Sequence, residues 1–222
     1  MRNVILRIAY DNDAQTGFES DFGFSCLIEL ERKRSLLFDT GSSRDILAFN
    51  LQQLHVKSET IDTIVLSHEH GDHTGGLEAV LHPGVRVFVP SSFSRNLKHA
   101  IAQMADVVEV VLPQEIVPGV YTTGELGAWQ KKEQSLVLKT PNGMVVVTGC
   151  GHPGLEAILA AAATFGQLYG VIGGFHGFNR LELLRELDLI VPCHCTRYKR
   201  AILERYPEKT KWCGAGMVLE LG

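Results

Sequence analysis

A chain of 222 residues, with 45% apolar and 21% charged residues, has the composition of an ordinary folded protein and enough length for a sizeable domain. Its formal net charge of -4, without long lysine- or arginine-rich blocks, argues against a nucleic-acid-binding surface. No apolar run approaches the roughly 18 residues that a membrane-spanning helix needs, so the sequence predicts neither nucleic-acid nor membrane partners.

The cysteines and the first residues favour a cytoplasmic location. Five cysteines are an odd number without framework spacing, which fits a reducing compartment better than a disulfide-stapled secreted domain. The chain begins in a strand-like pattern that lacks the shape of a signal peptide. We therefore expect a cytoplasmic protein.

The first half of the sequence alternates strand-like runs with polar loops and helical patterns. Between the first two expected strands lies the polar segment 11–21, which could be a mobile lid over a site or only a surface loop. In chain order, strands are expected at residues 3–9, 23–31, 35–38, 63–66 and 85–89, with helices at 44–54, 76–81 and 94–104.

Three successive strands in the second half each end in a turn of small residues that carries one histidine, and a helical pattern follows. The charged segment 129–133 is expected to be exposed, and a hairpin is expected around the turn 141–143. Strands are expected at residues 107–112, 119–122, 135–139, 144–148, 169–172, 189–192 and 217–221, with helices before 164, over 181–187 and from 196.

The apolar run at 63–66 ends in three histidines and two carboxylates within six residues. If the chain stays extended there, His68 and His70 point to one side and Glu69 to the other, because side chains alternate along a strand. Asp72 and His73 follow a bend and can face a second point nearby. The spacing predicts half of a two-metal site, where a polar loop with scattered surface histidines is the alternative.

Ligands bind at the carboxyl ends of strands in open α/β architectures, and most of the histidines lie there. We expect the strand-end histidines and Asp72 to line one cavity. Asp39 could cap the helix that follows it, but we favour a role in hydrogen-bonding and orienting a histidine of the metal loop. The strand-end histidines are His68, His70, His73, His152, His176 and His194, whereas His55, His82 and His99 are expected to be solvated.

The pattern His68-x-His70-x-Asp72-His73, followed by His152 and by His194 at the end of a late strand, resembles the metallo-β-lactamase superfamily. The resemblance covers essentially the whole chain. It implies one domain over residues 1–222 with an α/β fold, an αββα sandwich of two mixed β-sheets flanked by helices. It also implies a dinuclear metal site at one edge.

Carried over by position, the resemblance implies that His68, His70 and His152 hold one metal. Asp72, His73 and His194 would hold the other, with Asp72 and His194 also acting in catalysis. The local motifs resemble one branch, whose members are described as dihydropteroate-synthase-like or as the synthase of a methanopterin precursor, a ribofuranosylaminobenzene phosphate pterin. These motifs are Thr-Gly-Cys-Gly-His152, Gly-Gly-Phe-His176 and Pro-Cys-His194-Cys-Thr.

Most superfamily members carry a bridging aspartate between the third and last histidine motifs, and here the corresponding turn offers His176. A neutral imidazole binds only one metal and brings no negative charge. We therefore expect two Zn²⁺ sites of unequal occupancy, with Mn²⁺ or Fe as other metals that suit these ligands. His176 could instead donate a hydrogen bond without binding metal, and Asp188, which precedes the last of these strands, is a weaker substitute.

Cys150, Cys193 and Cys195 lie beside the histidine motifs, but the sequence has no Cys-x-x-Cys spacing. In an extended chain Cys193 and Cys195 would point away from the cavity. Cys150 would share the side of His152 but lie deeper in the sheet. We expect all three to be small, buried, apolar residues.

Two dications held by histidine and aspartate activate water and polarise the bond under attack, which predicts a hydrolase of an ester, lactone or phosphoester. Thr196, Arg197 and Arg180 could bind the phosphate or carboxylate of a small substrate, although these charges could equally be a solvated helix face. The alternatives are a pterin-condensing synthase and a non-catalytic metal-binding scaffold. The sequence allows a homodimer.

Overall fold

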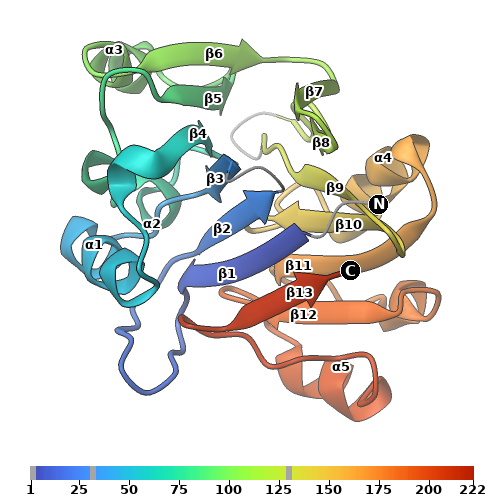
Figure 1. The fold of residues 1–222 in the computed structure, drawn as a ribbon. Helices are drawn as coiled ribbons and strands as arrows, with labels where there is room; N and C mark the ends of the chain where they lie inside the picture. Colours follow the sequence, from blue (N-terminus) through green and yellow to red (C-terminus); the bar gives the residue numbers. More distant parts are fainter. Residues whose placement is uncertain (1–3, 31–33, 129–131) are drawn as a thin grey trace.

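Two β-sheets pack face to face, with helices on their outer sides (Figure 1). The structure is a computed structural model that describes residues 4–30, 34–128 and 132–222. Over these residues, one sheet has seven strands in the order β13-β1-β2-β3-β4-β5-β6, and the other has six in the order β12-β11-β10-β9-β8-β7. Each sheet combines parallel and antiparallel pairs, so the expected αββα sandwich of two mixed sheets is confirmed.

The strands of the first sheet are β1 (Val4–Tyr10), β2 (Ser25–Leu30), β3 (Arg34–Phe38), β4 (Ile61–Val65), β5 (Arg86–Pro90), β6 (Asp106–Val110) and β13 (Val218–Leu221). Those of the second are β7 (Gln114–Val117), β8 (Val120–Thr122), β9 (Leu136–Thr140), β10 (Gly143–Thr148), β11 (Leu168–Gly174) and β12 (Leu189–Cys193). The α-helices are α1 (Arg44–Gln53), α2 (Gly71–Thr74), α3 (Arg95–Ala102), α4 (Leu155–Ala162) and α5 (Lys199–Arg205).

Alternating side chains along the strands build three apolar layers. In β10, Val145 and Val147 join the core between the sheets, whereas Val146 packs outward beneath α4. In β3, Phe38 enters the same central core and Leu37 packs against the residues of α1. Because both faces of these strands are buried, they read as nearly continuous apolar runs.

The parallel strands determine where the site lies. The neighbours from β3 to β6 are parallel, and so are those from β10 to β12. Loops at the carboxyl ends of parallel strands gather at one edge of a sheet. The loops after β3, β4, β10, β11 and β12 carry the strand-end histidines and Asp39.

Several expected helices differ in the structure. The turn after the metal loop forms α2 at Gly71–Thr74 and a 3₁₀ turn at Leu77–Ala79, in place of a helix over 76–81. The expected helix over 181–187 is a single 3₁₀ turn, Leu181–Leu184. The helix expected from residue 196 begins only at Lys199. The hairpin around residues 141–143 is confirmed by the β9–β10 pair.

Cys193, at the end of β12, forms a disulfide with Cys213. The prediction that Cys193 is a simple buried thiol is therefore wrong, although both sulfurs do lie within the apolar core between the sheets. The sequence spacing gave no sign of this disulfide, because the two cysteines meet only when the chain folds back after α5 toward β13. Within the described part of the chain, no helix has the length and apolar character to cross a membrane.

Candidate metal centre

The loop after β4 bends at Ser67 and Glu69, yet His68 and His70 lie on the same side and Glu69 on the other, as expected. His68 Nε2 and His70 Nδ1 lie 3.1 Å apart, and Ser67 Oγ lies 2.8 Å from His68 Nδ1. Glu69 turns away and accepts the backbone N–H of Ser94 at 2.6 Å, ahead of α3. Burial and the neighbouring His73 lower the pKa of His68 to about 2, so this imidazole is neutral and can bind a cation.

Asp39 fixes the orientation of His73. His73 is fully buried, and its Nδ1 lies 2.7 Å from Asp39 Oδ2. Asp39 also accepts the backbone N–H of Ser67 at 2.6 Å and its hydroxyl at 2.7 Å, which ties the ends of β3 and β4 together. Burial alone would lower the pKa of His73, but the Asp39 carboxylate raises it to about 10. The Nε2 of His73 is left facing Asp72 Oδ2, 3.4 Å away.

His194 is held by residues from the far end of the chain. Its Nε2 lies 3.1 Å from Asp72 Oδ2, and its Nδ1 lies 2.9 Å from Asn12 Oδ1. The backbone N–H of His194 donates to Asp11 Oδ1 at 2.6 Å. The segment 11–21 is therefore neither a plain surface loop nor only a lid, because its first two residues position His194.

Glu133 is a residue of the site that the sequence did not reveal. It was expected to be exposed with the rest of the charged segment 129–133, whose residues 129–131 lie outside the described part, but it is 1% exposed. Its Oε1 accepts the backbone N–H groups of residues 149–151 at 2.9–3.1 Å. Its Oε2 lies 3.1 Å from both the backbone nitrogen and Nδ1 of His152. Glu133 thus shapes the turn after β10 and directs His152 Nε2 toward the other histidines.

Burial would raise the pKa of Glu133, but the hydrogen bond with His152 and the backbone donors of the turn lower it to about 2. Glu133 is therefore a buried carboxylate ion surrounded by N–H donors. Hydrogen bonds of this kind are stronger than those between neutral groups. The turn after β10 is consequently a rigid support for His152.

Cys150 lies in the centre of the cluster. Its sulfur is 3.2 Å from His73 Nε2, so the prediction that Cys150 is merely a buried apolar residue deeper in the sheet is wrong. A hydrogen bond with the Cys195 thiol and burial raise the pKa of the Cys150 thiol in the metal-free protein. Cys195, half-buried, lies against the Cys150 carbonyl oxygen, with its sulfur 3.6 Å from that oxygen.

The donor atoms fall into two groups that could each hold an ion. In each group, one ligand atom from every residue lies within 4.8 Å of the others. Ligands of a tetrahedral zinc, held at about 2.0–2.3 Å from the ion, lie about 3.3–3.8 Å apart, so the donor sets fit a metal after small adjustments. One group is Asp72, His73, Cys150 and His194, and the other is His68, Cys150 and His152, with His70 beside His68.

His176 lies outside both groups. It is exposed, and its ring centroid is 5.2 Å from that of His152. The structure therefore places it beside a ligand candidate, whereas the sequence interpretation made it a ligand of one metal or a hydrogen-bond donor. Asp188 is also remote, because its carboxylate is exposed and lies 4.0 Å from Lys209 Nζ.

The backbone is unusual where the site residues leave their strands. Asp39, His176 and His194 all have φ between 44° and 58°, in the left-handed region that few non-glycine residues adopt. Such strain persists where the surrounding structure enforces it, and it clusters at functional sites. Gly149 is required for a different reason, since a Cβ there would clash with Ser67 Oγ and lie 3.0 Å from Asp39 Oδ2.

A cavity of about 340 Å³ adjoins the cluster at His152. It lies between the turn after β10 and the turn after β11, and Phe175, His176 and Phe178 contribute to its wall. Its remaining lining residues are Gly151, Gly154, Leu155, Glu156, Gly177 and Asn179. The position beside His152 makes it the candidate substrate cavity.

The three residues expected to hold an anion are not gathered in this cavity. Thr196 is buried, and its hydroxyl donates to the Cys193 carbonyl at 2.7 Å and accepts the backbone N–H of Phe175 at 2.9 Å. Arg197 is exposed. Its backbone N–H donates to the carbonyl of His176, a residue of the cavity wall, at 2.9 Å.

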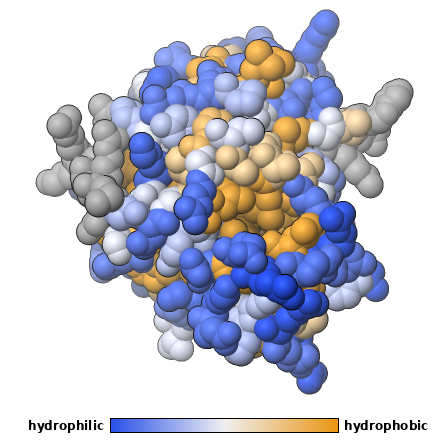
Figure 2. Space-filling model, turned by 90° about the vertical axis from the view of Figure 1, so that its right-hand side faces the viewer, coloured by the Kyte–Doolittle hydropathy of each residue, from blue (hydrophilic) through white to orange (hydrophobic). Residues whose placement is uncertain are grey.

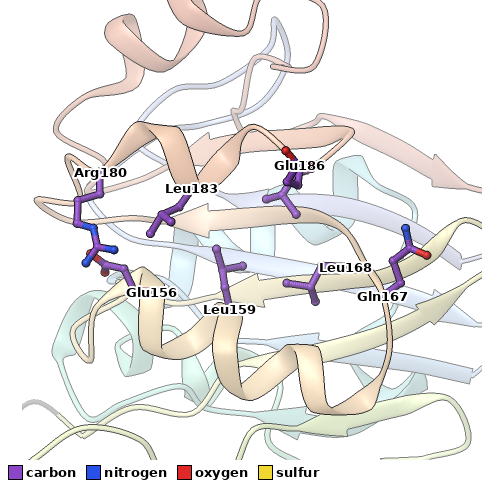
Figure 3. Close-up of a pocket in the computed structure, with 8 residues that line it drawn as sticks. Glu156, Leu159, Gln167, Leu168, Arg180, Leu183 and Glu186 are labelled. Atoms are coloured by element: carbon purple, nitrogen blue, oxygen red, sulfur yellow. The ribbon is translucent and has the colours of Figure 1, made fainter.

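Arg180 faces a second cavity, of about 500 Å³, between α4 and the 3₁₀ turn at Leu181–Leu184 (Figure 3). There its guanidinium lies 3.6 Å from the Glu156 carboxylate, at one end of a row of leucines. No histidine lines that cavity in the described residues. On the side of the molecule shown in Figure 2, apolar surface collects in a hollow ringed by hydrophilic side chains.

Residues 20–154 match the family model of the metallo-beta-lactamase superfamily, which is more than half of the chain. The chain belongs to the metallo-beta-lactamase superfamily. The matched segment contains the first histidine motif and ends just after His152. Among superfamily proteins, Tm1679, described as a metal-dependent hydrolase, is 26% identical and superposes with a TM-score of 0.82 over 99% of both chains.

Another relative supports the branch expected from the motifs. The 7,8-dihydropterin-6-methyl-4-(beta-D-ribofuranosyl)-aminobenzene-5'-phosphate synthase of Methanocaldococcus jannaschii is 26% identical over 91% of both chains. The fold alone is shared with Zn(2+)-bound PqqB from Methylobacterium extorquens, which is 13% identical with a TM-score of 0.62 over 97% of this chain and 99% of that one. The resemblance to the methanopterin-precursor branch is thus confirmed.

Proposed function

We propose that this metallo-beta-lactamase superfamily member is a hydrolase that binds two divalent ions, with zinc as the first choice and manganese or iron as alternatives. The observation that carries the proposal is the convergence of imidazole and carboxylate donors from the loops after β4, β10 and β12 on one buried cluster. The substrate is a small ester, lactone or phosphoester with an anionic group. The proposed location is the cytoplasm.

Three of the proposed ligands, all histidines, are oriented by an outer hydrogen-bond partner. His68, His70 and His152 would hold one ion, and Asp72, His73 and His194 the other. Asp39, Glu133 and Asn12 each contact the Nδ1 atom of one histidine, leaving its Nε2 for a metal. Outer partners of this kind fix the ring orientation and raise the basicity of the ligand.

When bound, two divalent ions supply Lewis-acid chemistry, activating water and polarising the oxygen of the bond under attack. The protein contributes the orientation of the reactants. Asp72 is half-buried, so one carboxylate oxygen can bind while the other orients a nucleophile. His194, against Asp72, keeps that carboxylate in position. The cavity beside His152 would receive the substrate, with Arg197 at its rim.

The two ions would be held unequally. In the proposed assignment Asp72 neutralises part of the charge at one site, whereas the other site has three neutral imidazoles. Electrostatic attraction therefore differs between the sites. One ion should exchange more readily than the other.

A synthase of the pterin type is the second candidate, and the Methanocaldococcus jannaschii relative is the observation that favours it. A condensing enzyme of that kind would also need a cavity for a phosphate-bearing substrate beside the donor cluster. The two functions differ in whether water or an aromatic substrate attacks.

Metal content and turnover together test the proposal. Metal-free protein should be loaded separately with Zn²⁺, Mn²⁺ and Fe²⁺ and assayed on a phosphodiester, a lactone and a thioester. We expect about two ions per chain, with turnover abolished by Asp72→Asn and retained in His99→Ala, a control on an exposed histidine of α3. Full loading without turnover would favour a scaffold. Product formation from a dihydropterin pyrophosphate and ribofuranosylaminobenzene 5'-phosphate, with release of pyrophosphate and without hydrolysis of other esters, would favour the synthase.

A further inference from the structure

Cys150 is the residue that belongs to both groups of donor atoms. Its sulfur lies within 4.8 Å of the donor atoms of His68 and His152, and also within 4.8 Å of those of Asp72, His73 and His194. No other residue of the described chain is shared in this way. The thiol therefore adjoins both proposed ion positions, and Cys150 is buried but 4% exposed.

The distances suit a shared ligand. A thiolate binds zinc at about 2.3 Å, and ions of two-metal sites lie about 3.5–4 Å apart. One sulfur at equal distance from both ions can therefore contact both, since two bonds of this length together exceed the separation of the ions. The 3.2 Å from Cys150 Sγ to His73 Nε2 is close to the spacing of two ligands on one ion.

Charge favours the same arrangement. Among the proposed ligands only Asp72 is an anion, whereas two dications bring four positive charges. A neutral imidazole cannot bridge, and His176 is outside both groups. The buried carboxylates of Asp39 and Glu133 are occupied by hydrogen bonds to His73 and His152, so they compensate charge from a second layer only.

We propose that Cys150, as a thiolate, is the anionic ligand shared by the two metal ions. It takes the bridging position for which the sequence offers no carboxylate. The nearby Cys195 lies outside both donor groups, and its sulfur is 3.6 Å from the Cys150 carbonyl oxygen. A bound metal deprotonates a coordinating thiol, so the raised pKa of the free protein does not oppose this role.

The inference rests on the proposed metal centre, and cobalt spectroscopy tests it without measuring turnover. Metal-free protein should be titrated with Co²⁺ while the sulfur-to-cobalt charge-transfer band in the near ultraviolet is recorded. In the wild type we expect the band to grow through both equivalents of Co²⁺, because one sulfur contacts both ions. Cys150→Ser should abolish the band, and Cys195→Ser, the matched control on the neighbouring thiol, should retain it.

Metal affinity gives a second readout. Cys150→Ser should weaken binding of the more exchangeable ion by more than the about 10- to 100-fold that loss of an outer partner costs. Should the variant fail to fold, alkylation of the wild type can replace it. Metal should then protect Cys150 while Cys195 is modified at an unchanged rate, as mapped by mass spectrometry.

Several outcomes would overturn the inference. A band that persists in Cys150→Ser, a band that stops growing after one equivalent, or alkylation of Cys150 at the same rate with and without metal would each exclude a shared thiolate. Cys150→Ser protein that still binds two ions and turns over substrate would refute the bridge alone and leave the proposed function standing. Wild-type protein that binds no ion would refute both.

Discussion

The buried, charged carboxylate of Glu133 receives most of its hydrogen bonds from backbone N–H groups. The N–H groups of residues 149–152 surround its carboxylate, and His152 adds a ring nitrogen. One side chain therefore sets both the path of the turn after β10 and the direction of the His152 ring. A substitution of Glu133 should therefore weaken metal binding, although Glu133 is not itself a proposed metal ligand.

In Glu133→Gln, an amide NH₂ replaces one carboxylate oxygen, so a donor faces the N–H groups of the turn. An unpaired buried donor costs about 1–3 kcal/mol of stability, and loss of an outer partner of a metal ligand weakens binding about 10–100-fold. Urea unfolding and a competition assay with a chelator would measure the two effects. Glu204→Gln, which removes an exposed carboxylate paired with Arg200, should leave both unchanged.

Gly149→Ala tests the close approach between the two sheets. The added methyl would clash with Ser67 Oγ and crowd Asp39, so β4 and β10 would have to separate. Overpacking of this kind typically costs about 1–3 kcal/mol, and the displacement of Ser67 should also weaken metal binding. Gly177→Ala is the matched control, because a Cβ there meets nothing within 4 Å. Equal stability and equal metal content in the two variants would contradict this account.

Arg197→Ala tests the anion preference of the substrate. Arg197 donates its backbone N–H to His176, which lines the cavity, and its exposed guanidinium lies over the Tyr198 ring, whereas Arg180 is paired with Glu156 in the other cavity. Loss of a charge-assisted hydrogen bond should raise KM for a phosphorylated substrate by about tenfold or more and leave KM for a neutral ester unchanged. Arg180→Ala should change neither value. Equal effects of both variants would place the anion elsewhere.

At the scale of the elements, the disulfide between Cys193 and Cys213 joins the end of β12 to the segment that leads into β13. The two strands belong to different sheets. A covalent bond at this point supports the side of the site that carries His194. The cross-link therefore bears on the position of β12 as well as on stability.

Removing the disulfide should lower the free energy of unfolding. The bonded cysteines are 20 residues apart, and closing a loop of this length is worth about 3 kcal/mol in the unfolded chain. Urea unfolding of Cys213→Ser without reductant should show this loss, and reductant should bring the wild type to the same midpoint. Titration of five thiols in unreduced, unfolded protein would show that the bond does not form in solution.

At the scale of the whole molecule, one apolar core contains side chains from both sheets, among them Phe38 of β3 and Val147 of β10. Neither sheet can bury that face alone. We expect thermal unfolding to show a single transition, with far-ultraviolet circular dichroism and aromatic fluorescence coinciding. A fragment of residues 1–128 should remain unfolded. Two separable transitions, or a folded fragment, would show that the halves are independent domains.

The sequence was most informative where local pattern decides structure. Apolar runs predicted most strands, and the position of His152 and His194 after such runs predicted that they would approach the loop of His68. Glu133 and Cys150 were misjudged because their surroundings come from distant segments. A carboxylate in a charged stretch gives no local sign of burial, and a thiol shows its neighbours only once the sheets are packed. Local propensity also predicted longer helices, over 76–81 and 181–187, than the short 3₁₀ turns that the structure has there.

His194 rests on Asp11 and Asn12, which lie 183 and 182 residues earlier in the chain. During synthesis, therefore, the loop of His68 leaves the ribosome with four of the six proposed ligands before His152 and His194 have been made. Loading of the complete proposed ligand set must then wait until His194 has been synthesised and has met the segment that carries Asp11 and Asn12.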